Sequence, residues 1–333
     1  MLIILLFLAF PTFPSHAFKV DSYNFFMPDV SPTKMDAYLC TPVRVNYTSS
    51  YYIIGFEPKA SMNTSHHMLL YGCTTPGDTK SFWNCGEMAV EESDESHNPC
   101  EDGSQIIYAW ARDAPKLVLP EGVGFKVGGD SPIQYLVLQV HYLHVHQFRD
   151  GVTDSSGIIL HYTERPLSKL AGVLLLGTGG ILKPSSEVHM ETACVITEDK
   201  ELHPFAFRTH THQYGQVVSG YRVRNDSGEM EWTLLGKRNP QDPQMFYPTV
   251  TDTIIRRGDI VAARCTMFNT RKKIVKIGGS SKDEMCNFYL AYWVEQSEPL
   301  DRKYCFTSGP PRYFWETGDP KLDNIPDEEA SHL

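Results

Sequence analysis

The sequence predicts an all-β protein built from two antiparallel β-sandwich domains. Strand-like segments rich in β-branched and aromatic residues dominate the chain, and Gly, Pro and Asp turn signals separate them. No long stretch shows the apolar periodicity of a helix. The chain has 333 residues, which is more than one sandwich core comfortably encloses. Two sandwiches are therefore the natural division.

Six segments show the strand pattern most clearly. They are residues 51–56, 133–142, 157–163, 217–224, 259–268 and 286–294. Proline interrupts the pattern within residues 164–167, so we place the domain boundary there. This division gives an N-terminal domain of residues 18–165 and a C-terminal domain of residues 166–318. Residues 319–333 are polar, acidic and contain proline, which predicts a disordered tail.

Residues 1–17 predict a signal peptide. An apolar run, too short to span a bilayer, precedes the small-residue sequence Ser15-His16-Ala17. No later stretch is long and apolar enough for a membrane anchor, so we expect no membrane span. The eight cysteines include no Cys-X-X-Cys pair and favour disulfides over zinc thiolate sites. We therefore expect the protein in the secretory pathway, either in the lumen of secretory granules or secreted.

Three sequons, which begin at Asn46, Asn63 and Asn225, predict N-glycosylation of an exported chain. A glycan on Asn63 would crowd the nearby His66, so we expect Asn46 or Asn225 to be used first. The formal net charge of −10 argues against nucleic acid or anionic lipid as a partner. An acidic protein that binds an anionic group must supply a local cation.

A His-X-His pair in the C-terminal half is the first indication of a metal site. Side chains alternate between the two faces of a strand. Two sets of residues would therefore each share a face: Arg208, His210 and His212 on one strand, and Met285, Asn287 and Tyr289 on another. If these faces meet, two imidazoles and a thioether converge on one metal, and thioether sulfur selects copper, especially Cu(I). The pair alone could equally bind zinc or lie on a wet sheet face, and most Met residues only fill cores.

A second histidine cluster strengthens the copper interpretation. His66 and His67 are adjacent, so a shared ion requires a bend, a bulge or a strand end at this point. His141 lies in the predicted strand 133–142. Three imidazoles without thiolate or carboxylate suit copper or zinc. Taken singly, His66 and His67 could also be solvated loop residues, and His141 could be a sheet residue whose ring nitrogens are already hydrogen-bonded.

Several motifs occur in an order that points to one family. They are HHMLL at 66–70, YAWAR at 108–112, GVGF at 122–125, LQVHY at 138–142, VSGYRVR at 218–224 and DEMCN at 283–287. Together they resemble the peptidylglycine α-hydroxylating monooxygenases, which are copper type II, ascorbate-dependent enzymes. The resemblance runs from about residue 23 to residue 305, nearly the whole mature chain. It implies two jelly-roll-like domains, each with one copper, and ascorbate as the reductant.

The resemblance also implies the role of each site residue. The electron-transfer copper is matched by His66, His67 and His141. The oxygen-activating copper, where catalysis occurs, is matched by His210, His212 and Met285. Arg208 matches the family residue that binds the C-terminal carboxylate of a glycine-extended peptide, and its guanidinium can bind a carboxylate bidentately. Tyr289 and Asn287 match family residues that form hydrogen bonds to the same substrate.

Four disulfides follow from the same resemblance, whereas the cysteines alone allow 105 connectivities. They are Cys40–Cys85, Cys73–Cys100, Cys194–Cys305 and Cys265–Cys286. His144 and His146 form another His-X-His pair, but the family has no histidine pair there, and we interpret them as loop residues.

The predicted function is hydroxylation of the Cα of a C-terminal glycine, the first step of peptide amidation in neuropeptide processing. A dopamine or tyramine β-monooxygenase is the nearest alternative, but its substrate has no carboxylate and its family lacks arginine at the position of Arg208. A non-catalytic, secreted copper-binding β-sandwich is a third reading. A zinc hydrolase would need a base near its metal, as in His-Glu-X-X-His, which is absent. The sequence ends at Leu333, so we expect a hydroxylase-only form that depends on a separate lyase.

Overall fold

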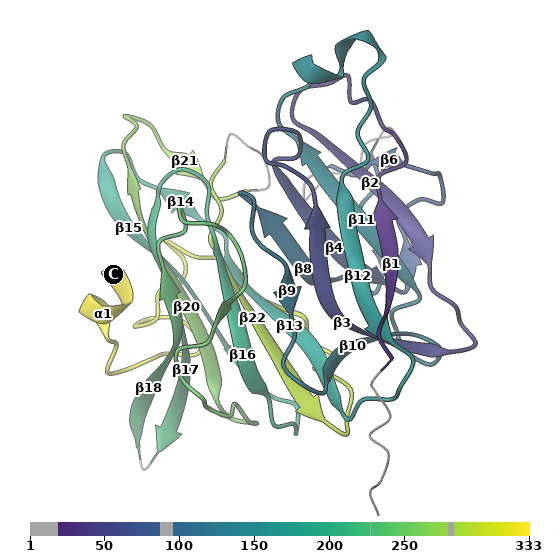
Figure 1. The fold of residues 1–333 in the computed structure, drawn as a ribbon. Coiled ribbons are helices and arrows are strands. Elements are labelled where there is room, and N and C mark those ends of the chain that lie inside the picture. The colour runs from purple at the N-terminus through teal and green to yellow at the C-terminus, as the bar shows by residue number, and fades with distance from the viewer. Residues whose placement is uncertain (1–18, 87–95, 227, 279–282) are drawn as a thin grey trace, which may run out of the picture.

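The computed structural model describes residues 19–86, 96–226, 228–278 and 283–333, and it shows an all-β protein (Figure 1). The predicted fold class is confirmed, and each of the six predicted strand segments overlaps a long strand. The predicted signal peptide lies outside the described residues. Within the described ranges, no helix has both the length and the apolar composition required to cross a membrane.

The N-terminal half is a sandwich of two facing sheets around one core. Its elements are β1 (Asp21–Phe26), β2 (Ala37–Arg44), β3 (Ser50–Lys59), β4 (His67–Cys73), β5 (Thr75–Pro76), β6 (Trp83–Asn84), β7 (Cys100–Asp102), β8 (Gln105–Ala111), β9 (Leu117–Val118), β10 (Val123–Gly128), β11 (Tyr135–Tyr142), the 3-10 helix η1 (His146–Gly151) and β12 (Gly157–Thr163). One sheet has the order β6-β2-β11-β4-β8, and the other runs β1-β12-β3-β10, with β9 beside β3. β5 and β7 form a separate small pair.

The C-terminal half repeats this two-sheet arrangement. Its elements are β13 (Lys169–Thr178), β14 (Ile181–Leu182), β15 (Ser186–Val195), β16 (His203–His210), β17 (Gly215–Asp226), β18 (Glu229–Arg238), β19 (Tyr247–Pro248), β20 (Ile260–Asn269), β21 (Val275–Lys276), β22 (Asn287–Glu295), β23 (Tyr304–Thr307) and the helix α1 (Asp327–Ser331). The outer sheet has the order β15-β20-β17-β18, and the inner sheet runs β13-β22-β16-β19, with β23 beside β13. β14 and β21 form a separate pair.

A short parallel pairing joins the two halves. Val123 of β10 lies opposite Lys169 of β13, and Gly124 lies opposite Leu170. This contact fuses one sheet of each half into a single ten-stranded sheet. The sequence predicted antiparallel domains, and most strand pairs are antiparallel, but β13 is parallel to both β10 and β23.

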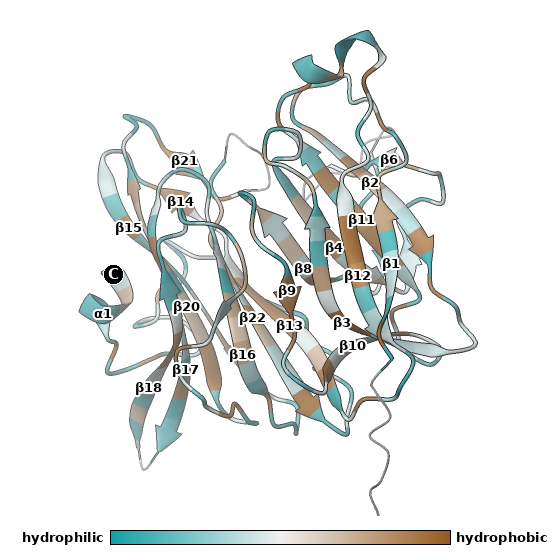
Figure 2. Cartoon of the chain, in the orientation of Figure 1, coloured by the Kyte–Doolittle hydropathy of each residue, from teal (hydrophilic) through white to brown (hydrophobic). Residues whose placement is uncertain are grey.

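The inner C-terminal sheet is buried on both faces. On β13, Leu174 and Leu176 belong to the C-terminal core, whereas Val173 and Leu175 pack into the core of the N-terminal half. A strand covered on both faces has a nearly continuous apolar sequence instead of an alternating one. Figure 2 shows these hydrophobic segments along the strands at the centre of the molecule. The two halves therefore share an apolar interface, and the candidate site residues of β16 and β22 lie on the side that faces it.

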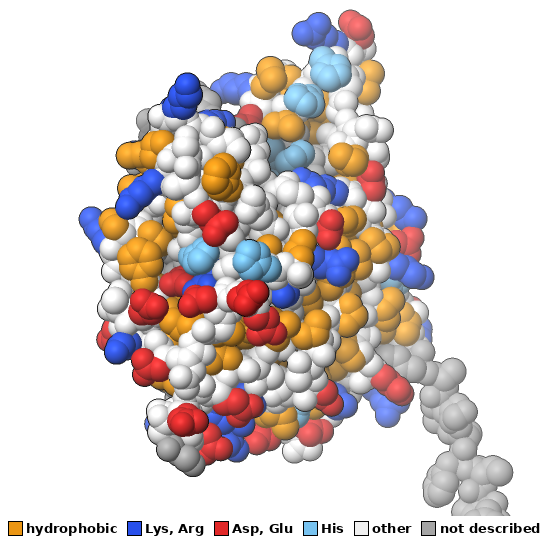
Figure 3. Space-filling view, turned by 90° about the vertical axis from the view of Figure 1, so that its left-hand side faces the viewer, with side chains coloured by type: hydrophobic (Ala, Val, Ile, Leu, Met, Phe, Trp, Pro, Cys, Tyr) orange, Lys and Arg blue, Asp and Glu red, His pale blue; other side chains and the backbone are white. Residues whose placement is uncertain are grey.

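Residues 319–333 fold against the outer C-terminal sheet, so the prediction of a disordered tail is wrong. Leu322 and Ala330 are buried in a cluster with Trp315. The guanidinium of Arg264 donates to Asp327 Oδ1 at 2.7 Å and anchors α1. Only a few apolar residues of the segment make these contacts. Because most of the segment is polar and acidic, its composition alone did not reveal that it folds. Figure 3 shows other Asp and Glu side chains along the lower part of this side of the molecule.

The four disulfides implied by the family resemblance are present. They join Cys40 to Cys85, Cys73 to Cys100, Cys194 to Cys305 and Cys265 to Cys286. The last of these ties the centre of β20 to the residue before β22. It therefore fixes the chain immediately beside Met285.

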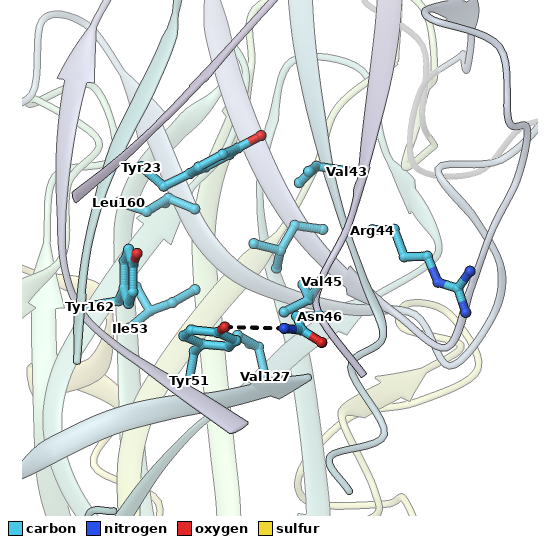
Figure 4. Close-up of a pocket in the computed structure, with 11 residues that line it drawn as sticks. Tyr23, Val43, Arg44, Val45, Asn46, Tyr51, Ile53, Val127, Leu160 and Tyr162 are labelled. Atoms are coloured by element: carbon cyan, nitrogen blue, oxygen red, sulfur yellow. Dashed lines mark hydrogen bonds between the residues drawn. The ribbon is translucent and has the colours of Figure 1, made fainter. Parts of the chain in front are cut away.

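An apolar cavity of about 280 Å³ opens between the two N-terminal sheets (Figure 4). Tyr23, Tyr51 and Tyr162 line it, and Asn46 of the first sequon lies at its edge with its amide 3.5 Å from the Tyr51 hydroxyl. None of the predicted metal or substrate residues lines this cavity. The predicted chemistry is located elsewhere, at the junction of the two halves.

Candidate metal centres and substrate site

The first histidine cluster forms where β4 begins beside β11. His67 is the first residue of β4 and lies opposite His141 in the strand register, while His66 precedes the strand. The backbone N–H of His66 donates to the carbonyl of His141 at 2.8 Å, which fixes the bend. One ring nitrogen from each residue falls within 4.8 Å of the others. We call His66, His67 and His141 the N-terminal cluster, and the strand end that it required is present.

Two neighbours orient His141. Its Nε2 lies 2.6 Å from Asp36 Oδ1, and its ring stacks on Tyr38 with the centroids 4.0 Å apart. A carboxylate that accepts from one ring nitrogen leaves the other nitrogen free as a metal donor. The free Nδ1 lies 3.3 Å from Nδ1 of His67. The cluster is therefore preorganised for a cation.

Burial favours the neutral, metal-binding form of His67 and His141, the two less exposed members of this cluster. Burial lowers the pKa of His141 to about 4, although the hydrogen bond to Asp36 opposes the shift. The pKa of His67 falls well below its ordinary value, first because the ring is buried and then because His141 and His66 are close. Three neutral imidazoles with converging nitrogens match the preference of copper or zinc.

The second set of candidate ligands lies at the ends of β16 and β22, which are adjacent antiparallel strands. Arg208 pairs with Tyr289, and His210 pairs with Asn287. His212 lies two residues after the end of β16, and Met285 lies two residues before the start of β22. We call His210, His212 and Met285 the C-terminal cluster. The rings of His210 and His212 have centroids 5.4 Å apart, and the Met285 sulfur lies 3.9 Å from Asn287 Nδ2.

Gln244 supports the C-terminal cluster, and sequence reasoning did not identify it. Its Oε1 lies 2.7 Å from His210 Nδ1 and 3.2 Å from Arg208 Nη2. Its backbone carbonyl also accepts from Arg208 Nε at 3.1 Å. Gln244 thus aligns a candidate metal ligand with a candidate substrate residue. No regular pattern marks it, because it reaches the site from the loop between β18 and β19.

Glu284 is a second support that sequence reasoning missed. Its buried carboxylate accepts the backbone N–H groups of His212, Gln213, Tyr214 and Met285. A charged acceptor for several N–H groups makes strong, directional bonds. Glu284 therefore ties the turn after β16 to the residue that carries the sulfur. Its position immediately before Met285 was the only available signal.

Arg208 is almost completely buried, and its environment is unusual for an arginine. It contacts Gln244 and lies over the ring of Tyr289, with 4.9 Å between the guanidinium carbon and the ring centroid. Burial lowers its pKa, whereas Tyr289 raises it. Across the described ranges, no Asp or Glu forms an ion pair with it. A buried cation without an anionic partner is costly, so this site is suited to an incoming carboxylate.

The two clusters influence each other across the junction of the halves. Burial, then the charges of Arg112 and His212, lower the pKa of His66. His210 contributes in the same way to the lowered pKa of His67. His144 and His146, the other His-X-His pair, lie just before and at the start of η1 with ring centroids 6.0 Å apart; His144 makes a small contribution to the lowered pKa of His66, but neither histidine belongs to the group of three converging imidazoles. The structure therefore sets two histidine clusters on opposite sides of one interface.

Comparison with known proteins agrees with this arrangement. Residues 23–149 match the family model described as copper type II ascorbate-dependent monooxygenase, N-terminal domain, and residues 169–318 match the corresponding C-terminal domain. These names supply copper and ascorbate as the family's cofactors. The gap between the two matched ranges, residues 150–168, lies within the segment that separates the two histidine clusters in sequence.

Individual relatives show which members are similar. The chain is 41% identical over 303 residues to peptidyl-glycine alpha-amidating monooxygenase A of Xenopus laevis, which covers 90% of this chain and 31% of that protein. It is 42% identical to the peptidylglycine alpha-amidating monooxygenase of Rattus norvegicus, covering 90% of this chain and 29% of that protein. Human dopamine beta-hydroxylase is 28% identical, covering 74% of this chain and 42% of that protein. The chain thus spans about a third of the length of its amidating relatives.

Proposed function

The chain belongs to the copper type II ascorbate-dependent monooxygenase family, and from this membership we propose that it hydroxylates the Cα of the C-terminal glycine of glycine-extended peptides. Oxygen and ascorbate are the co-substrates. The reaction is the first step of peptide amidation. The relatives named as peptidylglycine alpha-amidating monooxygenases are more similar to the chain than the dopamine hydroxylase.

The observation that carries the proposal is the buried guanidinium of Arg208, which forms no ion pair with an acidic residue in the part of the chain that the structure describes. It lies two residues from His210 on β16, so a carboxylate bound to it places the adjacent glycine near the C-terminal cluster. Gln244 binds the guanidinium through two neutral oxygens, which do not balance its positive charge. A substrate carboxylate would supply the negative charge. A phenylethylamine substrate has no such anion, which favours the peptide over the dopamine or tyramine alternative.

The donor sets fit two coppers with unequal roles. Three imidazoles in the N-terminal cluster suit either oxidation state of copper, whereas the thioether of Met285 favours Cu(I) in the C-terminal cluster. When bound, copper supplies the redox chemistry needed to insert one oxygen atom into a C–H bond. The chain holds the ligands: Asp36 orients His141, and Gln244 orients His210.

Tyr289 and Asn287 complete the proposed substrate site. Both are buried, and both lie on β22 directly opposite Arg208 and His210. Burial raises the pKa of Tyr289, so its hydroxyl stays protonated and can donate to a bound carboxylate. Asn287 offers an amide between the guanidinium and the sulfur. Together these side chains orient the terminal glycine and restrict its rotation.

We propose the same division of domains as before, residues 18–165 and 166–318, each with one metal. β12 ends at Thr163 and β13 begins at Lys169, so the proposed boundary falls in the connection between them.

We also propose residence in the secretory pathway, in the granule lumen or outside the cell, since four disulfides persist in oxidising compartments. Asn46, Asn63 and Asn225 are exposed and remain the proposed glycan sites.

Mass spectrometry tests the function directly. A short peptide that ends in glycine is incubated with copper-loaded protein, ascorbate and oxygen, and its C-terminally amidated counterpart serves as the control. We expect the free acid to gain one oxygen on the terminal glycine and the amidated peptide to remain unchanged. Equal turnover of both peptides contradicts the carboxylate assignment, and ascorbate-dependent hydroxylation of tyramine alone favours the alternative.

Amide release is proposed to need a separate lyase, because hydroxylation leaves the N–Cα bond of the glycine intact. At mildly acidic pH the hydroxylated peptide should accumulate, and amide should form only after lyase or base is added. Prompt formation of amide and glyoxylate by the purified 333-residue chain contradicts this proposal.

A further inference from the structure

A strained turn follows β8, the strand at the edge of the N-terminal sheet that contacts β13 of the other half (Figure 1). Arg112 and Asp113 have φ values of +55° and +53°, so two consecutive residues with side chains adopt the left-handed conformation. Such a conformation is unfavourable for residues other than glycine and persists where the surrounding contacts hold it. The contacts of these two side chains explain how it is held.

Asp113 connects the turn to the N-terminal cluster. Its Oδ1 accepts the backbone N–H of Met62 at 2.9 Å, four residues before His66. The residue before the turn, Ala111, lies opposite His67 in the strand register. The loop that carries His66 and the strand that carries His67 are therefore both anchored next to this turn.

Arg112 connects the same turn to the C-terminal cluster. Its guanidinium donates to the backbone carbonyl of Gln241 and, at 3.2 Å, to Gln241 Oε1. Gln241 Nε2 in turn donates to the backbone carbonyl of His212 at 2.7 Å. A continuous chain of hydrogen bonds thus runs from the turn to a ligand of the C-terminal cluster.

The other polar side-chain contacts between the described parts of the two halves lie away from both clusters. Lys126 pairs with Glu298 at 3.0 Å near the parallel junction of β10 and β13. Tyr304 donates to the carbonyl of Ser104 at 3.0 Å, at the start of β8. These contacts join the halves elsewhere, whereas Arg112 and Gln241 join them between the metal ligands.

We propose that Arg112 and Gln241 form a latch that sets the separation of the two clusters. The latch is a positioning device, because neither side chain offers a ligand to a metal. Asp113 bonds the turn that carries Arg112 to the loop of His66, and Gln241 bonds to the backbone carbonyl of His212. Its importance for electron transfer between two coppers rests on the proposed function, but its mechanical role in the metal-free protein does not.

The first test uses hydrogen–deuterium exchange on the metal-free protein, so it is independent of copper and of activity. Arg112→Asn removes the guanidinium but keeps a residue that tolerates the left-handed conformation. Gln241→Met removes the side-chain acceptor of Arg112 and the side-chain donor to His212 at nearly constant length, and it leaves the backbone carbonyl in place. Arg149→Asn, an exposed arginine in η1, is the matched control.

Both latch variants should raise amide exchange in residues 60–66 or 239–246 by about tenfold, since a hydrogen bond to a charged group is lost. The core strands β4 and β11 and the control should keep wild-type exchange. The effect of the double variant should be smaller than the sum of the two single effects, because both changes remove the contact between Arg112 and Gln241 Oε1. Unchanged exchange in both loops, or an equal rise in the Arg149 control, overturns the latch.

The second test measures the distance between two Cu(II) ions by pulsed dipolar spectroscopy. The latch variants should show a longer or broader distance distribution than the wild type and the control. A wild-type distribution in both variants overturns the proposal. Failure of the wild-type chain to bind two coppers instead contradicts the proposed function, and the exchange experiment then still decides the mechanical claim.

Discussion

The N-terminal cluster offers three imidazoles, whereas the C-terminal cluster replaces one of them with the thioether of Met285. Each forms at the end of two adjacent antiparallel strands. Their surroundings differ as well. A stacked tyrosine and a carboxylate brace the first, but beside the second lies a buried guanidinium that forms no ion pair with any described acidic residue. The two clusters therefore differ in the softness of their candidate donors and in the charge beside them, and this difference carries the proposed division between electron supply and substrate chemistry.

Met285→Ile should have the largest effect, because it removes the feature that distinguishes the two clusters. The exchange nearly conserves volume, so the fold should lose less than about 1.5 kcal/mol. Hydroxylation of a glycine-extended peptide should nevertheless fall to background. Thermal unfolding and turnover are measured on the same preparation. Full turnover in this variant would show that Met285 is only a packing residue.

Arg208→Gln should have the next largest effect, since it removes the guanidinium proposed to bind the peptide carboxylate beside the C-terminal cluster. Losing one charge-assisted hydrogen bond costs about 1.5–3 kcal/mol, which corresponds to a rise in KM of roughly 10- to 150-fold. The exposed Arg149 provides the matched arginine control. Steady-state kinetics with the peptide acid decide the matter, and an unchanged KM would remove Arg208 from the substrate site.

The pH dependence of stability sharpens the comparison from the N-terminal side. The folded pKa of His141 is about 4, against an ordinary value of 6.5. The unfolded chain therefore takes up a proton below about pH 6.5, while the folded chain does so only near pH 4. The stability contributed by neutral His141 is complete above pH 6.5 and is lost as the pH falls toward 4.

The difference of about 2.5 pKa units corresponds to roughly 3 kcal/mol in the metal-free protein. Thermal unfolding between pH 7 and pH 4 should therefore depend less steeply on pH in His141→Phe than in the wild type. His146→Phe, in an exposed position of η1, serves as the control. An identical slope for wild type and His141→Phe would contradict the role of burial at this cluster.

Glu284→Gln should have the smallest effect and should act on one cluster only. An amide cannot accept four N–H groups as strongly as a carboxylate, so unfolding should become easier by about 1–3 kcal/mol. Copper affinity should decrease at the C-terminal cluster and stay constant at the N-terminal cluster. Calorimetric titration can separate the two sites, with the exposed Glu295→Gln as control. Equal losses at both sites would mean that Glu284 supports the whole fold.

Sequence reasoning reached the site residues that have a chemical identity of their own. Strand alternation placed Arg208 and His210 on one face, and residue chemistry marked Met285 as a soft donor. The structure adds the register, which puts Arg208 opposite Tyr289 on the neighbouring strand. Alternation predicts the face of a strand, but pairing between distant strands depends on the tertiary fold.

Supporting residues could not be predicted in the same way. Gln244 and Gln241 are ordinary loop glutamines until the fold brings them to His210 and His212. The tail was mispredicted because two buried apolar residues, Leu322 and Ala330, outweigh its acidic composition. The parallel contact between β10 and β13 involves only two residue pairs, too short to leave a sequence pattern.

X-ray absorption of the fully reduced, copper-loaded protein tests the difference between the clusters most directly. Wild-type protein should bind two coppers per chain, and the spectrum should contain one sulfur ligand for every two coppers. His212→Ala should reduce the copper content toward one and remove the sulfur contribution, while the imidazole ligands of the N-terminal cluster remain. Two coppers without any sulfur ligand in the wild type, or an unchanged spectrum and copper content in His212→Ala, would contradict the account.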